Sequence, residues 1–268
     1  MTFSESELDQ LLEQAKAISR KAGAFIRQER ENFDASAIEH KGFNDLVSYV
    51  DKEAEQIIVD GLSELLPEAG FITEEGTKST RSESLNWIID PLDGTTNFIH
   101  ALPVFSVSIA LELGGAVILG VVYEVNRDEC FSARKGGGAF CNEEKISVSA
   151  APDLSASLLA TGFPYYNFEE IDKYLIALKS LMQKTHGLRR MGSAAVDLAY
   201  VACGRFEGYF EYNLNSYDVA GGIILVQEAG GHVTDFAGGD DYLFGREVVA
   251  SNSSIHEEFL RNVKTIWS

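Results

Sequence analysis

The segment from Trp87 to Asn97 constrains this 268-residue chain more than any other. It begins with an apolar, strand-like run that extends to Ile89, and the run ends at two aspartates, Asp90 and Asp93. Two carboxylates held about 4 Å apart repel each other by roughly 4 kcal/mol at an effective dielectric constant near 20. The end of a strand tolerates that repulsion when a divalent cation binds there. The segment therefore favours a fold that places a metal site at the end of a strand.

The two residues that follow the aspartates, Gly94 and Thr95, are suited to binding a phosphate. They begin a turn that we expect to lead into a short helix, whose first N–H groups have no partner within the helix. The alternative is ordinary turn chemistry, since Asp, Pro and Gly are common in loops. Carboxylates beside a Gly-Thr turn favour metal-assisted phosphoryl chemistry.

Acidic residues also stand at the ends of two further elements. Glu74 and Glu75 follow the apolar pair Phe71-Ile72, and Asp218 stands at the head of an apolar helical run over 223–226. An acid in the first turn of a helix also stabilises the helix dipole, which is the alternative for Asp218. Three acidic elements of this kind make a shared metal site the better interpretation. Because the candidate ligands are oxygens, and His-rich and thiolate clusters are missing from the sequence, the pattern predicts Mg²⁺ rather than Zn²⁺.

The composition is that of a globular protein and excludes several classes of function. Hydrophobic residues make up 45% of the chain, which argues against disorder and permits a sizeable core. The net charge of −19 argues against general binding to nucleic acid or an anionic membrane, because both need a basic surface. The N-terminus has the pattern of an amphipathic helix rather than of a signal peptide. An odd number of cysteines without metal-ligand spacing predicts reduced thiols in a cytoplasmic protein: Cys130, Cys141 and Cys203.

The pattern of residues 1–150 predicts that the N-terminal half of the chain has an α+β fold. Apolar residues recur at helical spacing from Leu8 to Ile26, and a second helical pattern follows Asp51. Two strands then lead into the acidic positions Glu74 and Asp90. The rest of this half predicts an antiparallel meander that starts with a hairpin over 104–113 and 116–123.

Residues 151–268 alternate strand and helix patterns, which predicts an α/β half with a mainly parallel sheet. The predicted helices cover 168–182, 193–202, 218–228 and 255–263. No low-complexity linker separates the two halves, so we expect one compact unit.

Several motifs together resemble the inositol monophosphatase family of metal-dependent, lithium-sensitive phosphatases. The central motif is WIIDPLDGTTNF, preceded by ITEEGT and followed later by YDVAGG. The resemblance covers nearly the whole chain through the segments NDLVSYVDKEAE, SARKGGGAFCN, MGSAAVDLAYVACGRFEGYFE and VQEAGGHVTDF. The Asp-Pro-Leu-Asp-Gly-Thr element is typical of the superfamily, whereas the Thr-Thr-Asn-Phe and Gly-Ser-Ala-Ala stretches point to inositol monophosphatase-like members. Tyr217 departs from the family, which usually has Trp before the third aspartate.

The resemblance implies a layered αβαβα sandwich with the metal site between the two halves. It implies a first Mg²⁺ on Glu74, Asp90 and the carbonyl oxygen of Leu92. A second Mg²⁺ is then held by Asp90, Asp93 and Asp218, with Asp90 bridging the two ions, and a weaker third ion lies near Glu74.

The resemblance also implies which residues perform catalysis and bind substrate. The Thr95 hydroxyl orients the attacking water and Asp51 accepts its proton, although for Asp51 alone an N-cap of the second helix is the alternative. The N–H groups of Gly94 and Thr95 contact phosphate. Glu211 contacts substrate hydroxyls, whereas the default for a glutamate at a strand end is a surface position. The catalytic set is Asp51, Glu74 and Thr95. The substrate set is Asp93, Gly192, Ser193, Ala194, Glu211 and Asp218, in which Ser193 is also a candidate N-cap.

Together these residues predict a Mg²⁺-dependent phosphomonoesterase. The expected substrate is inositol monophosphate or a similar small polyol phosphate, hydrolysed by direct in-line attack of metal-activated water. Fructose 1,6-bisphosphate, adenosine 3′,5′-bisphosphate and histidinol phosphate stay open as substrates. Some bacterial members of the family associate with RNA polymerase and ribosomal RNA processing factors, and a non-catalytic partner of that transcription machinery is the alternative. We expect a homodimer that contacts neither membranes nor, in general, nucleic acid.

Overall fold

The computed structural model describes residues 2–33, 38–42, 45–164 and 167–267. Seven α-helices and fourteen strands are described over these residues. The helices are α1 (Glu5–Asn32), α2 (Tyr49–Leu65), α3 (Thr95–Ile99), α4 (Ile171–Met182), α5 (Ala194–Ala202), α6 (Ser216–Glu228) and α7 (His256–Trp267). The first nine strands are β1 (Ile38–Gly42), β2 (Asp45–Ser48), β3 (Gly70–Thr73), β4 (Leu85–Asp93), β5 (Ser106–Leu113), β6 (Ala116–Glu124), β7 (Glu129–Arg134), β8 (Gly138–Cys141) and β9 (Glu144–Ile146). The remaining strands are β10 (Leu158–Thr161), β11 (Gly187–Arg189), β12 (Gly208–Tyr212), β13 (Gly231–Thr234) and β14 (Glu247–Asn252).

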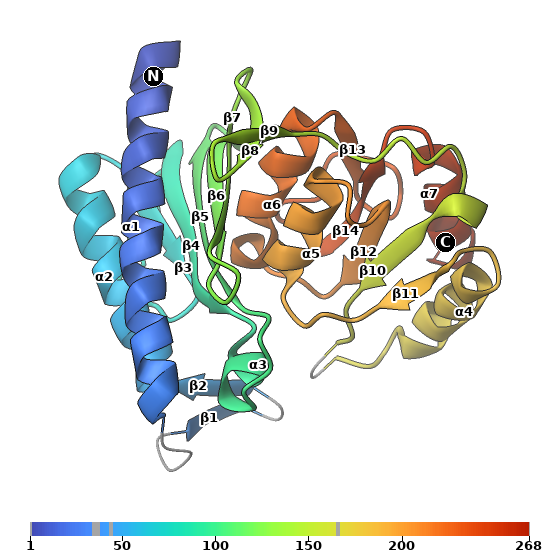
Figure 1. The fold of residues 1–268 in the computed structure, drawn as a ribbon, viewed down its shortest axis with the longest axis horizontal. Coiled ribbons are helices and arrows are strands. Elements are labelled where there is room, and N and C mark those ends of the chain that lie inside the picture. Colours follow the sequence, from blue (N-terminus) through green and yellow to red (C-terminus); the bar gives the residue numbers. More distant parts are fainter. Residues whose placement is uncertain (1, 34–37, 43–44, 165–166, 268) are drawn as a thin grey trace.

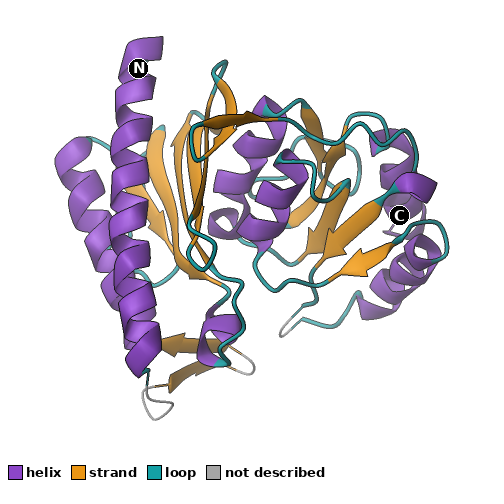
Figure 2. Ribbon diagram, in the orientation of Figure 1, coloured by secondary structure: helices purple, strands orange, loops and turns teal. Residues whose placement is uncertain are grey.

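Helices and sheets alternate in five layers (Figure 1). α1 and α2 pack on the outer face of the sheet that runs from β3 to β9, and α6 covers the other face of that sheet. α5 packs beside α6 and against β12 and β14, while α4 and α7 pack together on the far side of the second sheet (Figure 2). This arrangement confirms the predicted αβαβα sandwich.

The first sheet has the strand order β3-β4-β5-β6-β7-β8-β9. From β4 to β9 every neighbouring pair is antiparallel, which confirms the predicted meander, and β3 pairs with β4 in parallel. β4 is central to the site because its carboxyl end carries Asp90 and Asp93.

The second sheet has the strand order β11-β10-β12-β14-β13 and is mixed. β10 pairs in parallel with β11 and β12, but β14 pairs antiparallel with both β12 and β13. Four of its five strands therefore run in the same direction, as predicted for a mainly parallel sheet, and β14 is the one exception. β12 and β13 are joined through α6 and do run parallel to each other, as a helical crossover requires. The antiparallel strand β14 lies between them, and the strand–helix alternation in the sequence does not reveal that insertion.

Most predicted helices and strands form close to their expected bounds. α4 begins at Ile171, three residues later than predicted, and the short strands β1, β2 and β11 were not predicted. Asn44, the first residue of the NDLVSYVDKEAE motif, lies outside the described residues. The three cysteines carry free thiols, as predicted. No helix among the described ranges is both long and apolar enough to cross a membrane.

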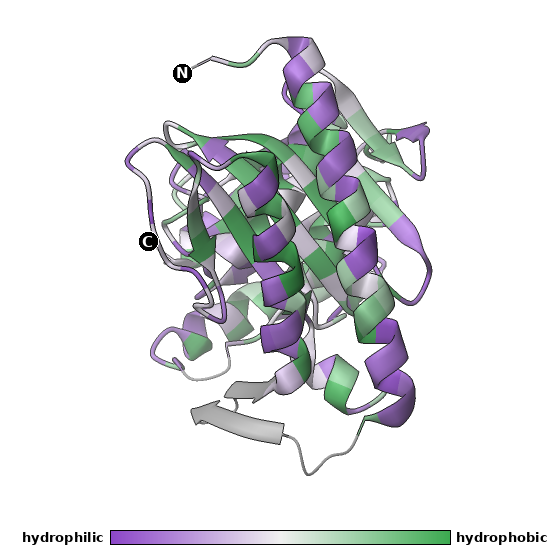
Figure 3. Cartoon of the chain, turned by 90° about the vertical axis from the view of Figure 1, so that its left-hand side faces the viewer, coloured by the Kyte–Doolittle hydropathy of each residue, from purple (hydrophilic) through white to green (hydrophobic). Residues whose placement is uncertain are grey.

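α1 is amphipathic and is capped at its N-terminus. Ser4 and Glu7 form a capping box at its start, where the Ser4 hydroxyl accepts a hydrogen bond from the Glu7 N–H. Figure 3 shows α1 and α2 side by side over the sheet, with hydrophilic and hydrophobic residues alternating along each helix. The buried positions of α1 include Leu8, Ala15 and Ile26.

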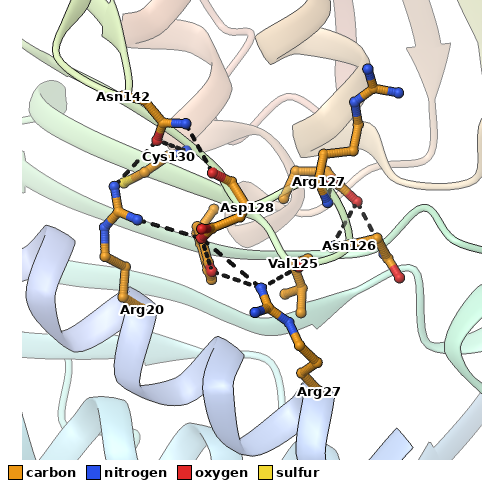
Figure 4. Close-up of polar contacts among 10 residues, drawn as sticks. Arg20, Arg27, Val125, Asn126, Arg127, Asp128, Cys130 and Asn142 are labelled. Atoms are coloured by element: carbon orange, nitrogen blue, oxygen red, sulfur yellow. Dashed lines mark hydrogen bonds and ion pairs between the residues drawn. The ribbon is translucent and has the colours of Figure 1, made fainter.

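Polar contacts also connect α1 to the β6–β7 turn (Figure 4). The Arg27 guanidinium donates hydrogen bonds to the Tyr123 hydroxyl at 3.0 Å and to the Val125 carbonyl at 2.6 Å. The Arg20 guanidinium lies 3.5 Å from the Asp128 carboxylate. Exposed ion pairs stabilise a protein little, so these contacts serve mainly to orient α1 on the sheet.

Candidate active site

A cleft of about 170 Å³ lies where the carboxyl end of β4 meets the amino ends of α5 and α6. It contains every residue predicted to bind metal, phosphate or substrate, and the only predicted catalytic residue outside its lining is Asp51. The predicted residues in the lining are Glu74, Asp90, Leu92, Asp93, Gly94, Thr95, Gly192, Ser193, Ala194, Glu211 and Asp218. The structure therefore brings the predicted residues together, and their roles stay predictions.

A bulge at the end of β4 directs Asp90 and Asp93 into the same cleft. Asp90 pairs with Ser108 and Asp93 with Ser106, so β4 has one more residue than β5 between these pairs. In a regular strand, residues three positions apart point to opposite faces of the sheet. The extra residue turns the side chains of both aspartates to the same face of the sheet. Bulges next to active sites commonly redirect side chains in this way. The Asp90 carboxylate also accepts a hydrogen bond from the Leu92 N–H at 3.0 Å.

The cleft gathers negative charge that burial makes costly. Burial raises the pKa of Asp90 well above its ordinary value, and the neighbouring charges of Glu74, Asp93 and Asp218 raise it further. Burial also raises the pKa of Asp93 to about 6 and that of Asp218 to about 7. Like charges and desolvation both disfavour the ionised carboxylates, so this wall is electrostatically suited to a cation.

The oxygen ligands that the cleft offers fit Mg²⁺ better than a softer metal. Four carboxylates and the Leu92 carbonyl oxygen line one cleft, and hard divalent cations prefer such oxygen ligands. No group of three or more described His, Cys, Asp and Glu side chains has the arrangement of a preformed metal cage. Mg²⁺ does not require such a cage, because it retains several waters and binds through one or two carboxylates together with substrate phosphate.

Asp93 connects the two halves of the chain. Its Oδ2 accepts a hydrogen bond from the Ser193 hydroxyl and another from the Ala195 N–H, both at 2.7 Å. Ser193 is also the N-cap of α5, as predicted, because its hydroxyl accepts the Val196 N–H at 3.3 Å. The amino end of α5 is thereby attached to the end of β4.

Asp218 has both a capping role and a place in the cleft. It is the third residue of α6, and its Oδ2 accepts the Asn215 N–H at 2.6 Å in a capping box. The interpretation of Asp218 as a helix-start residue is therefore correct in part. The same carboxylate lines the cleft, with Tyr217 beside it.

Asp51 and Thr95 meet across two elements. The Thr95 hydroxyl lies 2.9 Å from Asp51 Oδ1 and 3.0 Å from the Leu92 carbonyl oxygen, and its single proton is donated to one of them at a time. The N-cap of α2 is Ser48, and Asp51 is the third residue of the helix, where its Oδ2 accepts the Ser48 N–H and hydroxyl. The alternative that Asp51 is the N-cap was thus wrong, because the N-cap lies three residues earlier. Asp51 does complete the capping box.

Gly94 permits the tight approach at the cleft. It has φ of +99°, which favours glycine, and it is the N-cap of α3, the short helix that the sequence predicted after this turn. A Cβ on Gly94 would lie 3.0 Å from the Val104 carbonyl oxygen and 3.2 Å from that of Gly192. The backbone N–H groups at the start of α3 therefore adjoin the cleft without an intervening side chain.

The far wall of the cleft carries acidic residues of the C-terminal half. Glu211 is buried, so the default expectation of a surface glutamate was wrong. The Tyr209 hydroxyl donates to its Oε2 at 2.5 Å, and burial raises the pKa of Glu211 to about 8. A Cβ on Gly162 would lie about 2 Å from this carboxylate, so the Glu211 side chain rests against the Gly162 backbone.

Sequence reasoning missed two charged residues of this wall, Arg190 and Asp197. Asp197 is buried in the first turn of α5, and its Oδ1 has no hydrogen-bond partner among the described residues. Burial raises its pKa well above the ordinary value, as do the charges of Glu211 and Asp93. The signal in the sequence was one acidic residue within the apolar run AAVDLAYVA.

Comparison with known proteins agrees with this fold. The model of the inositol monophosphatase family matches residues 7–268. The chain belongs to the inositol monophosphatase family.

Relatives within this family carry two kinds of name. The Nus factor SuhB of Escherichia coli (strain K12) is 43% identical over 255 residues, which are 95% of this chain and 96% of that protein. The crystal structure of the extragenic suppressor protein suhB from Bartonella henselae has a TM-score of 0.89 and 40% identity, covering 96% of this chain and 98% of that one. The inositol monophosphatase structure from Anabaena (Nostoc) sp. PCC 7120 has a TM-score of 0.86 and 35% identity, covering 97% of each chain.

Proposed function

We propose that this protein is a Mg²⁺-dependent phosphomonoesterase that hydrolyses inositol monophosphate or a similar small polyol phosphate. The observation that carries this proposal is the meeting of four acids, the start of a helix and Glu211 in one cleft. Membership of a phosphatase family whose members use metal ions supports the proposal.

In this proposal Glu74, Asp90, Asp93, Asp218 and the Leu92 carbonyl oxygen hold two Mg²⁺ ions, and a weaker third ion lies near Glu74. When bound, the cations neutralise phosphate charge and lower the pKa of water. The hydrogen bonds from Ser193 and Ala195 hold the Asp93 carboxylate in place for this role.

The start of α3 binds the phosphate group in the same proposal. The N–H groups of Gly94 and Thr95 have no helical acceptor and adjoin the acidic wall. The Thr95 hydroxyl positions the attacking water for in-line displacement, and Asp51 accepts the proton that Thr95 passes on. Asp51 suits a proton acceptor because burial raises its pKa from the ordinary range.

The far wall of the cleft recognises the polyol. Glu211, with one oxygen bonded to Tyr209, has a second oxygen that accepts a substrate hydroxyl. Gly192, Ser193 and Ala194 adjoin the same space at the start of α5. Carboxyl oxygens accept hydrogen bonds from neutral hydroxyls, so this wall suits the ring of the substrate rather than its phosphate.

A phosphate-release assay across small phosphomonoesters tests the proposal. We expect release from inositol monophosphate to exceed that from fructose 1,6-bisphosphate, adenosine 3′,5′-bisphosphate and histidinol phosphate. Activity should require Mg²⁺, disappear with EDTA and be inhibited by lithium. Asp93→Asn should remove most of the activity and leave the folded structure intact. Near-normal turnover by that variant, or equal turnover in EDTA, would contradict the metal-dependent mechanism.

A second candidate function follows from the relatives named Nus factor SuhB. We propose that the chain also contacts a protein of the transcription machinery, and that it does so as a cytoplasmic homodimer. A net charge of −19 gives no support to tight binding of RNA by counterion release. Analytical ultracentrifugation with purified bacterial RNA polymerase tests this candidate. Co-sedimentation with the polymerase supports it, whereas tight, salt-sensitive binding to RNA alone would contradict the proposed mode of contact.

A further inference from the structure

Glu55 is a buried carboxylate of α2 for which the catalytic scheme has no use. It lies one helical turn after Asp51, and both side chains are fully buried. Buried acids at this spacing repel each other, so each needs its own hydrogen-bond donors. Asp51 bonds to Thr95 and Ser48, as described above.

The donors that satisfy Glu55 come from the loop that follows β3. The Glu75 N–H donates to Glu55 Oε2 at 2.8 Å, and the Thr77 N–H donates to Glu55 Oε1 at 2.7 Å. Both carboxylate oxygens are thus bonded to the backbone of one short loop. Hydrogen bonds to a charged acceptor are stronger than neutral ones, so this loop is firmly attached to α2.

Glu74 lies directly between this attachment and the first sheet. Its own N–H donates to the Ile89 carbonyl oxygen at 3.3 Å, which continues the parallel pairing of β3 with β4. The next peptide N–H, that of Glu75, is held by Glu55. The backbone of Glu74 is therefore fixed on one side by β4, which carries Asp90, and on the other side by α2.

We propose that Glu55 is a positioning residue that holds Glu74 at the metal site and so sets the affinity of the cleft for Mg²⁺. One face of α2 then orients both parts of the reaction centre, because Asp51 holds Thr95 and Glu55 holds the Glu74 loop. This inference rests on the proposed function, since it takes Glu74 as a metal ligand. Residues that orient metal ligands in this way commonly change metal affinity by about 10- to 100-fold when they are replaced.

Isothermal titration of metal-free protein with Mg²⁺ tests the proposal without reference to activity. Glu55→Gln keeps the shape of the side chain. It replaces one accepting oxygen by an amide NH₂ group, which is a donor and cannot bond to the backbone N–H that faces it. We expect the Kd for Mg²⁺ to rise by about 10-fold or more, with kcat at saturating Mg²⁺ close to that of the wild type. The matched control is Glu53→Gln on the exposed face of the same helix, which should leave the Kd unchanged.

A second pair of variants tests the loop without altering the core. Thr77 is exposed, and Thr77→Pro removes the N–H that bonds to Glu55, whereas Thr77→Ala removes the same hydroxyl and keeps the N–H. We expect only the proline variant to weaken Mg²⁺ binding. In Glu55→Gln, amide hydrogen exchange should become faster at Glu75 and Thr77 and remain unchanged in α6.

The outcomes separate the positioning role from the proposed function. One outcome would overturn the positioning role alone. In it, the wild-type protein binds Mg²⁺ and hydrolyses substrate, but Glu55→Gln and Thr77→Pro leave the Kd for Mg²⁺ unchanged. A lower Tm with an unchanged Kd would show a purely structural role for Glu55 and would overturn it equally. Wild-type protein that neither binds Mg²⁺ nor releases phosphate would overturn the proposed function.

Discussion

Asp51 and Thr95 are 44 positions apart in the sequence and are joined by one hydrogen bond of 2.9 Å. Each is held independently of the other. Asp51 is fixed by the Ser48 cap of α2, and Thr95 lies in the first turn of α3. The pair therefore forms a defined unit at the scale of single residues, and its function is accessible to paired substitutions.

Thr95→Ala and Asp51→Asn should each reduce kcat strongly. If the two residues form one proton relay, either change disables it, with a loss on the order of 10²–10⁴ for general-base catalysis. The double variant should be little worse than the poorer single variant, since residues that act as a unit show non-additive losses. Steady-state kinetics of the three variants measures this coupling.

Asp51 also completes the cap of α2, so the stability of each variant needs a control measurement. Thermal unfolding should show only a modest loss for Asp51→Asn, since Asn accepts hydrogen bonds through its carbonyl oxygen. Losses in kcat that multiply across the two substitutions would show that Asp51 and Thr95 act separately.

At the scale of elements, helix starts concentrate the polar groups of the cleft. α3, α5 and α6 all begin at its wall, and the positive ends of their helix dipoles favour anions there. Ser193 has two roles at this wall, because its hydroxyl caps α5 and also donates a hydrogen bond to Asp93. The attachment of α5 to β4 therefore depends on one small hydroxyl side chain.

Ser193→Ala should lower stability and weaken metal binding together. Loss of an N-cap hydroxyl costs about 1 kcal/mol, and loss of the donor to Asp93 adds to that cost. Ser193→Thr is the matched control, since threonine keeps both hydrogen bonds. Chemical denaturation and Mg²⁺ titration measure the two effects. A stability loss in Ser193→Ala with an unchanged Kd for Mg²⁺ would mean that Asp93 does not need this donor.

At the scale of the whole molecule, α6 belongs to both sheets. It packs on the inner face of the first sheet and on β13 and β14 of the second. A Cβ on Gly120 of β6 would lie 2.9 Å from the Gly221 carbonyl oxygen, so strand and helix are in close backbone contact. One buried apolar cluster contains Ile88 and Val122 of the first sheet together with Ile223 of α6.

We propose from this packing that residues 1–150 and 151–268 fold as one unit. Scanning calorimetry of the full chain should show a single transition with equal calorimetric and van 't Hoff enthalpies. A fragment of residues 1–150 should aggregate, because the apolar face that α6 covers would be exposed. Two separate transitions, or a monomeric and cooperatively folded fragment, would contradict a single unit.

The acidic cleft should make the metal-free protein less stable as pH rises. Burial raises the pKa of Asp93 to about 6, that of Asp218 to about 7 and that of Glu211 to about 8. Carboxyl groups of the unfolded chain have pKa values of about 4. Between these values the folded state binds more protons than the unfolded state, so the free energy of unfolding falls with rising pH. The fall is about 1.4 kcal/mol per pH unit for each full proton of difference.

Unfolding in EDTA at a series of pH values from about 5 to about 8 measures this dependence. Mg²⁺ should restore stability, and its effect should grow with pH as the carboxylates ionise. Asp218→Asn should flatten the metal-free curve, since it removes one of the titrating groups. A metal-free protein whose Tm rises through this range would contradict the raised pKa values.

The sequence by itself determined the elements and the residue types of the site. Apolar periodicity predicted α1 and the hairpin of β5 and β6, because side-chain spacing follows directly from helix and strand geometry. The acids at the ends of β3 and β4 and at the start of α6 were also evident from the sequence, since each interrupts or bounds an apolar run.

Only the tertiary structure decided how these parts meet. The insertion of β14 between β12 and β13 depends on long-range pairing, which leaves no local signal in the sequence. The bulge that turns Asp90 and Asp93 to one face depends on the register with β5. Burial of Glu211 and Asp197 results from the packing of the C-terminal half around the cleft. These features arise from contacts between residues far apart in the chain, and local propensity does not encode such contacts.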